Sequence, residues 1–250
     1  MPLLSPFSAL RSAFITAITL CGVEAWAQST SSVSGPVVDP GWDAEYRLGV
    51  TDRTAGDSLT HRFGLARSVS SDVRLRGLVA FEDAPTGDLE LSYIEADILW
   101  QFAGREADSR YQSAVRLDVR RDELDDLTVI GLNWLNQWHL SEGWRLRLMG
   151  LVDAELGEGG ADGAILANRV SLSRKLNADL RLGLDMYNSW GNTGDGFGTF
   201  DEQGHVAGVT LAGPAPLDLE WTVGALAGLS DAAPDHVLQF RLSRSFDAAP

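Results

Sequence analysis

Apolar and polar residues alternate along almost the whole chain between Trp42 and Phe246. In residues 144–156, for example, the even positions are apolar or glycine, whereas the odd positions include charged residues such as Arg145 and Asp153. Successive side chains of a β-strand point to opposite faces, so a period of two residues is typical of strands with one apolar and one polar face. No helical period interrupts this alternation, and the pattern predicts an all-β protein.

Clusters of Gly, Pro, Asp, Asn and Ser divide the alternating pattern into about twelve segments. Each segment is long enough for one strand, and the clusters between them are typical of turns and loops. The predicted strands cover residues 42–52, 58–69, 72–82, 91–102, 110–121, 128–140, 144–156, 163–175, 178–190, 203–213, 216–229 and 235–246.

The chain also lacks a predicted membrane helix. Beyond residues 13–23, no stretch approaches the roughly 20 apolar residues that such a helix needs. Only helices and closed barrels satisfy every backbone hydrogen bond in lipid, and an even number of strands returns both termini to the same side of the membrane. The pattern therefore predicts a transmembrane antiparallel up-and-down β-barrel of about 12 strands.

The predicted connections test this topology, because outer-membrane barrels alternate tight periplasmic turns with longer external loops. If the first strand runs outward from the periplasm, the periplasmic turns lie near residues 70–71, 103–109, 141–143, 176–177 and 213–216. The external connections then lie near residues 53–57, 83–90, 122–127, 157–162, 191–202 and 230–234. The external connections are generally the longer ones, and 103–109 is the exception.

Aromatic residues gather near the ends of the predicted strands, on the apolar face. Tyr and Trp favour the lipid–water interface, where the ring is half buried and its polar atom stays hydrated. A soluble β-sandwich core is the alternative, but it gives no reason for this placement. The predicted membrane-interface girdle comprises Trp42, Trp100, Phe102, Tyr111, Trp138, Trp144, Trp190 and Phe246.

A charged residue that faces lipid at mid-depth costs roughly 2–4 kcal/mol, so the outward face tolerates few polar residues. Arg67 and Arg244 lie near periplasmic strand ends, where a long side chain can reach the interface. Asn168 lies in mid-strand and has no explanation from the sequence. The polar exceptions on the outward face are His61, Arg67, Asn136, Asn168, Asn188 and Arg244.

The N-terminal residues predict a secreted protein. The apolar run 13–23 follows Arg11, and Ala25-Trp26-Ala27 matches the small-x-small site of signal peptidase. We therefore predict a signal peptide over residues 1–27, cleaved near Ala27. A lipoprotein cut before Cys21 is the alternative, but Leu20 stands where that cut expects a small residue.

Cleavage near Ala27 would remove Cys21, the only cysteine, and leave a mature chain with no disulfide. The remaining chain divides into three predicted parts. Residues 28–41 form an N-terminal periplasmic linker, residues 42–246 form the outer-membrane β-barrel, and residues 247–250 form a C-terminal tail.

The last predicted strand carries a resemblance to a known group of proteins. Leu238, Phe240, Leu242 and Phe246 alternate with polar residues, and this resembles the C-terminal signature of Gram-negative outer-membrane β-barrels. The match departs from the usual form because four residues follow Phe246. The resemblance implies an outer-membrane location, contact with outer-membrane lipid and lipopolysaccharide, and recognition of this strand by the barrel-assembly machinery. No motif indicates one family among the mid-sized, porin-like barrels.

The inward face carries acids and bases in nearly equal number. A barrel of about twelve strands encloses a narrow space, so these side chains predict a polar lumen crossed by Arg–carboxylate pairs. The lumen is either a channel for small polar or charged solutes, or a salt-bridged plug that only holds the shape of the barrel. The predicted lumen-lining residues are Arg47, Arg62, Arg74, Arg76, Glu95, Asp97, Arg116, Asp118, Arg120, Arg145, Arg147, Asp153, Glu155, Arg181 and Asp185.

The net charge of −15 comes largely from acids in the predicted external loops. Such loops could gather divalent cations or steer cationic solutes, or they could simply form a solvated cell surface. Residues 191–202 lack the spacing of a calcium-binding loop, and we predict no metal site and no cofactor. The chain has no basic patch or phosphate-binding loop, so nucleic-acid binding is not expected.

One short motif raises the possibility of catalysis. His139 and Ser141 resemble the strand-borne His and Ser of a family of twelve-stranded outer-membrane phospholipases. The motif lies at a predicted periplasmic turn, however, and Glu142 replaces the Asn that follows the family's Ser. We therefore predict no catalytic residues, and a lipid-active enzyme remains the third alternative after a channel and a structural or surface-binding barrel.

Overall fold

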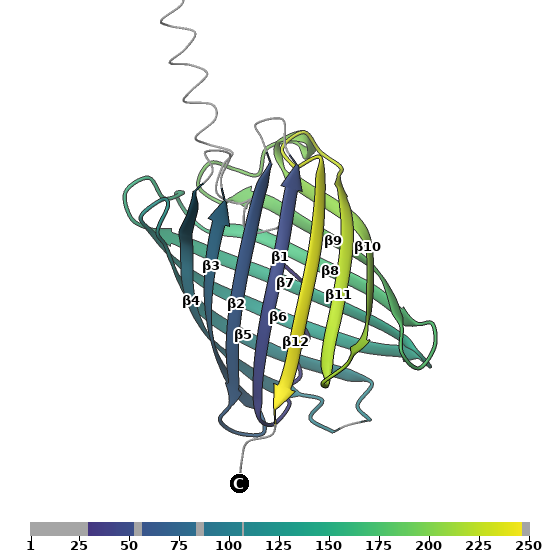
Figure 1. The fold of residues 1–250 in the computed structure, drawn as a ribbon. Helices are drawn as coiled ribbons and strands as arrows, with labels where there is room; N and C mark the ends of the chain where they lie inside the picture. Colours follow the sequence, from purple (N-terminus) through teal and green to yellow (C-terminus); the bar gives the residue numbers. More distant parts are fainter. Residues whose placement is uncertain (1–29, 53–56, 84–87, 107, 247–250) are drawn as a thin grey trace, which may run out of the picture.

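The computed structural model describes residues 30–52, 57–83, 88–106 and 108–246 (Figure 1). The prediction of about twelve strands is confirmed, with most boundaries within three residues of the predicted ones. The strands are β1 (Trp42–Asp52), β2 (Ser58–Ser68), β3 (Val73–Asp83), β4 (Leu89–Ala103), β5 (Tyr111–Asp122), β6 (Leu127–Ser141), β7 (Trp144–Leu156), β8 (Ile165–Lys175), β9 (Arg181–Asn192), β10 (Gly204–Ala215), β11 (Leu219–Gly228) and β12 (His236–Phe246), and the 3-10 helix η1 (Phe200–Glu202) precedes β10.

The strands form a closed barrel in which each one pairs antiparallel with its neighbours in sequence. Closure comes from β12, which pairs with β1 along its whole length and places Trp42 opposite Phe246 (Figure 1). The prediction of an antiparallel up-and-down barrel is therefore confirmed. We call the end that carries Trp42 and Phe246 the terminal rim, and the opposite end the loop rim.

The connections also follow the predicted alternation, with shifts of a few residues such as the one between β10 and β11. The turn between β10 and β11 was expected at 213–216, but β10 continues through Pro214 to Ala215. Leu217 and Asp218 have φ of 67° and 57°, a left-handed pair that suits the twist of a tight hairpin. The side chain of Trp221 donates a hydrogen bond to the carbonyl of Pro214 at 2.9 Å and holds this end of the hairpin together.

The dimensions and the outer face of the barrel suit a bilayer. The shortest strand, β11, has 10 residues, and a tilted strand needs about 9–11 to cross the hydrocarbon. None of the helical segments that the structure describes is long and apolar enough to cross a membrane. Large apolar side chains lie exposed around the barrel, far more than a soluble monomer presents in one patch. They include Phe63, Leu65, Ile94, Ile98, Leu117, Val119, Leu132, Trp134, Val152, Leu184, Val209, Val223 and Leu238.

The polar residues on the outer face are paired with one another. Asn168, which the sequence left unexplained, accepts a hydrogen bond from Asn188 at 2.5 Å, and the Asn188 carbonyl contacts Nδ1 of His205 at 2.8 Å. His61 is hydrogen bonded to the hydroxyl of Tyr46 at 2.9 Å. An unpaired polar group in hydrocarbon costs several kcal/mol. Pairing across neighbouring strands therefore allows these exceptions to the outward pattern.

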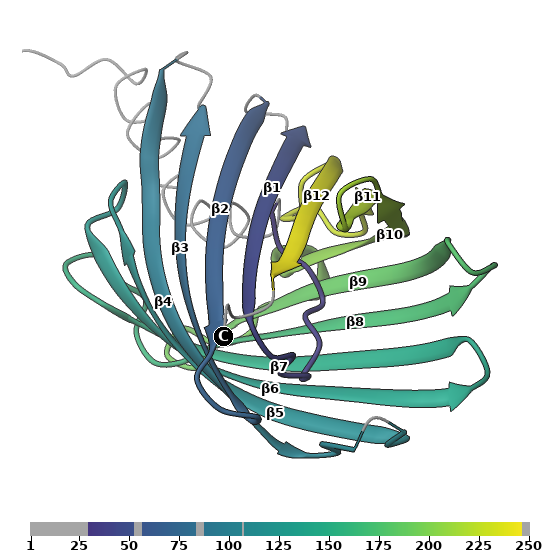
Figure 2. The ribbon, with the colours of Figure 1, turned by 60° about the horizontal axis from the view of Figure 1, so that its bottom comes forward.

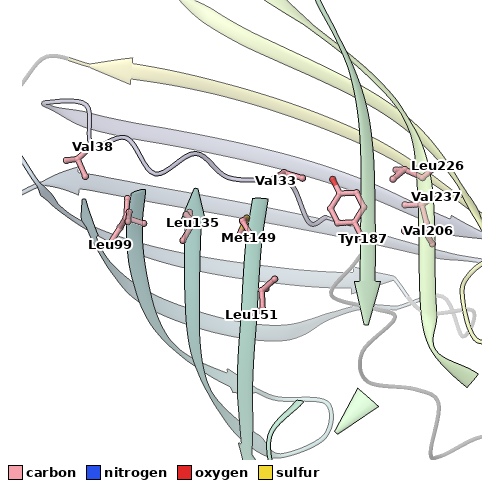
Figure 3. Close-up of a cluster of buried hydrophobic side chains, with 11 residues drawn as sticks. Val33, Val38, Leu99, Leu135, Met149, Leu151, Tyr187, Val206, Leu226 and Val237 are labelled. Atoms are coloured by element: carbon pink, nitrogen blue, oxygen red, sulfur yellow. The ribbon is translucent and has the colours of Figure 1, made fainter. Parts of the chain in front are cut away.

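The residues before β1 lie inside the barrel. We expected a periplasmic linker over 28–41, but residues 30–38 enter the lumen at the terminal rim and reach mid-depth (Figure 2). Val33 and Val38 are buried against inward apolar side chains of the barrel (Figure 3). Its buried valines and Pro36 give this segment a surface to pack. The predicted signal peptide, its cleavage site and the tail 247–250 lie outside the described residues.

Candidate functional site: the lumen

The lumen is the candidate site, because charged side chains from most of the strands converge there. The predicted lumen residues occupy the strand positions that alternate with the exposed apolar face, and Arg47, Asp97 and Asp185 are among the buried ones. Two groups stand out among these residues. In one group guanidinium and carboxylate groups are paired, and in the other three neighbouring guanidinium groups have no carboxylate partner.

Glu45 is the centre of the paired group. Its carboxylate contacts Arg47 at 2.7 Å, Arg241 at 2.9 Å and Arg62 at 3.4 Å. These three arginines belong to β1, β12 and β2, so one largely buried carboxylate joins the strands on both sides of the closure. The sequence placed Glu45 on the inward face, but nothing in the alternation distinguished it from other inward acids.

Further ion pairs continue around the wall from β3 to β5. Arg76 contacts Asp97 at 2.6 Å and Glu95 at 3.5 Å, across the β3–β4 pair. Arg116 contacts Asp118 at 3.3 Å within β5. We call the ion-paired residues of β1–β5 and β12 the paired wall: Glu45, Arg47, Arg62, Arg76, Glu95, Asp97, Arg116, Asp118 and Arg241.

Gly131 on β6 makes space for two acids at the edge of the paired wall. It lies between Asp118 and Asp153 in the sheet register. A Cβ atom at Gly131 would lie 2.3 Å from an oxygen of Asp118 and 2.7 Å from an oxygen of Asp153. The two carboxylates can therefore approach the backbone here because residue 131 is glycine. Asn133 donates to the Asp118 carboxylate at 2.5 Å and offsets part of its charge.

The second group of arginines lies on β7 and β9, toward the terminal rim. Among the residues that the structure describes, Arg145, Arg147 and Arg181 have no carboxylate within ion-pair distance. Arg147 donates to the side chain of Gln137 at 2.6 Å, and Arg181 donates to the hydroxyl of Ser173 at 3.2 Å. We call Arg145, Arg147 and Arg181 the arginine face. It concentrates positive charge in a part of the lumen where the acids that act on Arg145, Glu220 and Asp185, lie beyond ion-pair distance.

The remaining predicted lumen residues make other contacts. Arg120 lies 5.4 Å over the ring of Tyr93. Glu155 accepts a hydrogen bond from the backbone of Ala161 at 2.9 Å and supports the loop after β7. Within the described ranges Arg74 forms no ion pair.

The prediction of a polar lumen is wrong in one respect, because a layer of apolar side chains also points inward. Met149 and Leu151 continue the inward positions of Arg147 along β7, and they pack with residues of the N-terminal segment. The sequence could have revealed this layer, because Met149 and Leu151 occupy positions of the alternating pattern that point inward. The inward apolar residues are Leu99, Leu135, Met149, Leu151, Tyr187, Val206, Leu226 and Val237 (Figure 3).

Residues 30–38 narrow the lumen from within, and a cavity remains beside their inner end. Thr30, Ser31 and Ser32 line it on one side. The barrel wall supplies Arg47, Asp185, Tyr187, Thr210, Thr222, Gln239 and Arg241. The cavity therefore has both charged and hydroxyl groups, near mid-depth of the barrel.

The predicted girdle residues lie at strand ends, and arginines stack on several of them. Arg67 lies 5.1 Å from the ring centroid of Trp42, and Arg244 lies 4.8 Å from that of Phe246. A guanidinium over an aromatic face gains cation–π energy while its charge stays near water. This contact gives the outward arginines at the terminal rim a physical role. Further ring contacts join Trp100 to Phe102, Tyr111 to Trp138, Arg174 to Trp144, and Trp190 to His205.

The two other candidate features contain no assembled site in the described part of the chain. No hydrogen bond joins His139 to Ser141, and the His139 ring instead contacts Gln137 at 3.1 Å. At the loop rim, no group of three or more His, Cys, Asp or Glu side chains in the described ranges is placed to hold a metal ion. Glu202 accepts hydrogen bonds from the backbone and hydroxyl of Thr199, which lower the pKa of this carboxyl.

Comparison with known proteins finds similarity of fold only. No protein-family model and no curated protein matches the chain. The solved structures that resemble it include an outer membrane channel from Pseudomonas putida F1, with a TM-score of 0.60, 12% identity, and coverage of 87% of this chain and 100% of that one.

Two porins resemble the chain with slightly lower TM-scores. The KdgM porin matches with a TM-score of 0.57 and 8% identity over 82% of this chain and 99% of its own. The NanC porin matches with a TM-score of 0.57 and 8% identity over 82% of this chain and 100% of its own. The chain therefore has the fold of outer-membrane β-barrels of the porin type.

Proposed function

We propose that this protein is an outer-membrane channel for small anionic solutes, inserted after removal of residues 1–27. The arginine face carries the proposal. Three partly buried guanidinium groups without carboxylate partners lie in the lumen, where a cation withdrawn from water is costly unless an anion approaches it. A carboxylate or phosphate group in transit would supply that partner, and the planar guanidinium binds such groups with two parallel hydrogen bonds.

Other observations support the location and the porin-like character. The exposed apolar band and the strand lengths suit a bilayer, and the solved structures with similar folds include proteins named as porins and outer membrane channels. In that setting the outer face would contact lipid and lipopolysaccharide, and β12 would be the strand that the barrel-assembly machinery recognises. The narrow lumen favours small solutes over folded or polymeric ones.

Planar-bilayer recording with a salt gradient tests the proposal. The reversal potential of the wild-type channel should indicate selectivity for anions. The double substitution Arg147→Gln with Arg181→Gln should lower the anion-to-cation permeability ratio severalfold. Arg67→Gln is the matched control, because Arg67 has the same charge on the outer face near the terminal rim, and the ratio should then stay close to the wild-type value. Cation selectivity of the wild type, or equal ratios for all three proteins, would contradict an anion channel.

A structural barrel is the second candidate, and the N-terminal segment favours it. Residues 30–38 occupy the lumen near the terminal rim, and ion pairs cross much of the remaining wall. A folded protein that never gives single-channel steps, with or without residues 30–38, would support this candidate. A lipid-active enzyme gains no support, because His139 and Ser141 make no mutual contact in the described structure.

A further inference from the structure

The N-terminal segment is held in the lumen by specific contacts. The backbone N–H of Val38 donates to Gln101 at 2.9 Å near the terminal rim, and that of Ser34 donates to the sulfur of Met149 at 3.2 Å. At the inner end Arg47 donates to the carbonyl of Thr30 at 2.9 Å. The segment therefore has a defined path from the rim to mid-depth, along β4, β7 and β1 (Figure 3).

One of these contacts covers the arginine face. Arg147 donates to the carbonyl of Val33 at 3.3 Å. A Cβ atom at Gly35 would lie 2.8 Å from the Arg147 guanidinium, so the backbone of the segment approaches this group closely, and a side chain here would require the guanidinium to move. The neutral carbonyl of the segment thus occupies a place on Arg147 where an anionic oxygen would bind more strongly.

Because the segment carries no charge, an anion can replace it at Arg147. Residues 30–38 (TSSVSGPVV) contain no charged side chain, so the segment brings no carboxylate to Arg145, Arg147 or Arg181. Hydrogen bonds with an ionised partner are about twice as strong as those between neutral groups. A carboxylate-bearing solute therefore has an energetic advantage over the Val33 carbonyl at the same guanidinium. The packing of Val33 and Val38 opposes its displacement.

We infer that residues 30–38 form a tethered plug, and that an anionic solute displaces it by competing for Arg147. The inference rests on the proposed function, because a plug has a purpose only if the lumen conducts. Gly41 and Trp42 anchor the plug to the start of β1, so the displaced segment stays attached at the terminal rim. When no anion is present, the carbonyl of Val33 accepts a hydrogen bond from Arg147 in place of the solute.

A disulfide lock tests the plug directly. Ser34→Cys with Met149→Cys, in a chain that also carries Cys21→Ser, places the only two thiols at the two positions where the Ser34 backbone N–H contacts the Met149 side chain. The oxidised protein should conduct severalfold less than the same protein after reduction. Succinate should raise the conductance of the reduced form but not that of the oxidised form, and the neutral analogue succinamide should raise neither. Equal conductance of the cross-linked protein before and after reduction would overturn the plug.

Deletion of residues 30–38 separates this inference from the proposed function. The deleted protein should conduct more than the wild type, and succinate should no longer activate it. If the deleted protein and the wild type conduct equally, the channel stands and the plug is wrong. If the deleted protein folds but gives no conductance, the channel itself is wrong and the plug is wrong with it. Heat-modifiable migration on a detergent gel reports whether each variant is a folded barrel.

Discussion

The two sides of the lumen use the same residue type for opposite purposes. On the paired wall each ion-paired arginine contacts at least one carboxylate, and Glu45 contacts three arginines from three strands. On the arginine face, the hydrogen bonds of Arg147 within the described structure go to a side-chain amide and a backbone carbonyl. A guanidinium that is already paired inside a barrel is part of its framework, whereas one that faces neutral groups is available to a ligand. Lumen charge alone therefore does not identify a transport path.

The largest effect should come from Glu45→Gln. This change leaves Arg47, Arg62 and Arg241 without their shared carboxylate, and removal of one partner from a buried ion pair costs about 3–5 kcal/mol. We expect a loss of this size in the free energy of unfolding, measured by urea titration of the folded barrel in lipid or detergent.

Glu220→Gln is the matched control for that experiment. Glu220 lies on β11, is exposed, and forms no ion pair among the described residues. Its substitution should change the free energy of unfolding by less than about 0.5 kcal/mol. Equal effects of the two substitutions would show that the Glu45 cluster does not stabilise the closure.

An intermediate effect should distinguish the two groups of arginines directly. Arg116→Ala leaves Asp118 beside Asp153 without its ion-pair partner, and we expect a loss of about 3 kcal/mol in the free energy of unfolding. Arg147→Ala removes a cation that has no carboxylate partner, so the loss should stay below about 1 kcal/mol while anion selectivity falls. The comparison would fail if Arg147→Ala were the more destabilising of the two.

A smaller effect than that of Arg116→Ala concerns the space at Gly131. Gly131→Ala places a methyl group against the carboxylates of Asp118 and Asp153 and should destabilise the barrel by about 1–3 kcal/mol. Gly150→Ala on β7 is the control, because a Cβ atom there meets no atom within 4 Å. This control should be neutral or slightly stabilising, as alanine is favoured over glycine in a strand. Thermal unfolding of both variants measures the difference.

Most of the fold could be predicted from the sequence, because lipid imposes a strict rule on every strand. Each strand must present apolar side chains outward, so the alternation fixed strand number, topology and parity together. The misplaced turn near Pro214 arose because proline suggested an end to β10, whereas the hairpin is formed by the left-handed residues Leu217 and Asp218. Local chemistry of this kind does not follow from periodicity.

Far less of the candidate site could be predicted. Parity placed Arg116 and Arg147 on the inward face but could not show that the first has a carboxylate partner and the second has none, because pairing depends on strand register and side-chain conformation. The position of residues 30–38 was also missed, since no periodic signal marks an irregular segment and its Ser-rich composition is typical of a linker. The packing role of its valines becomes evident only in the structure, where they belong to one cluster with Met149 and Tyr187.

The pairing of β12 with β1 has a consequence for biogenesis. Ser245 and Asp43, which share a hydrogen bond across that pairing, are separated by 202 positions in sequence. Contacts of such high sequence separation form late, because the chain entropy lost in bringing them together is recovered only once neighbouring strands are in place. Arg241 therefore reaches Glu45 only when the cylinder is complete, and the N-terminal segment must already be inside or must thread in afterwards through the terminal rim. The ion pair between Glu45 and Arg241 is therefore present only in barrels in which β12 has paired with β1.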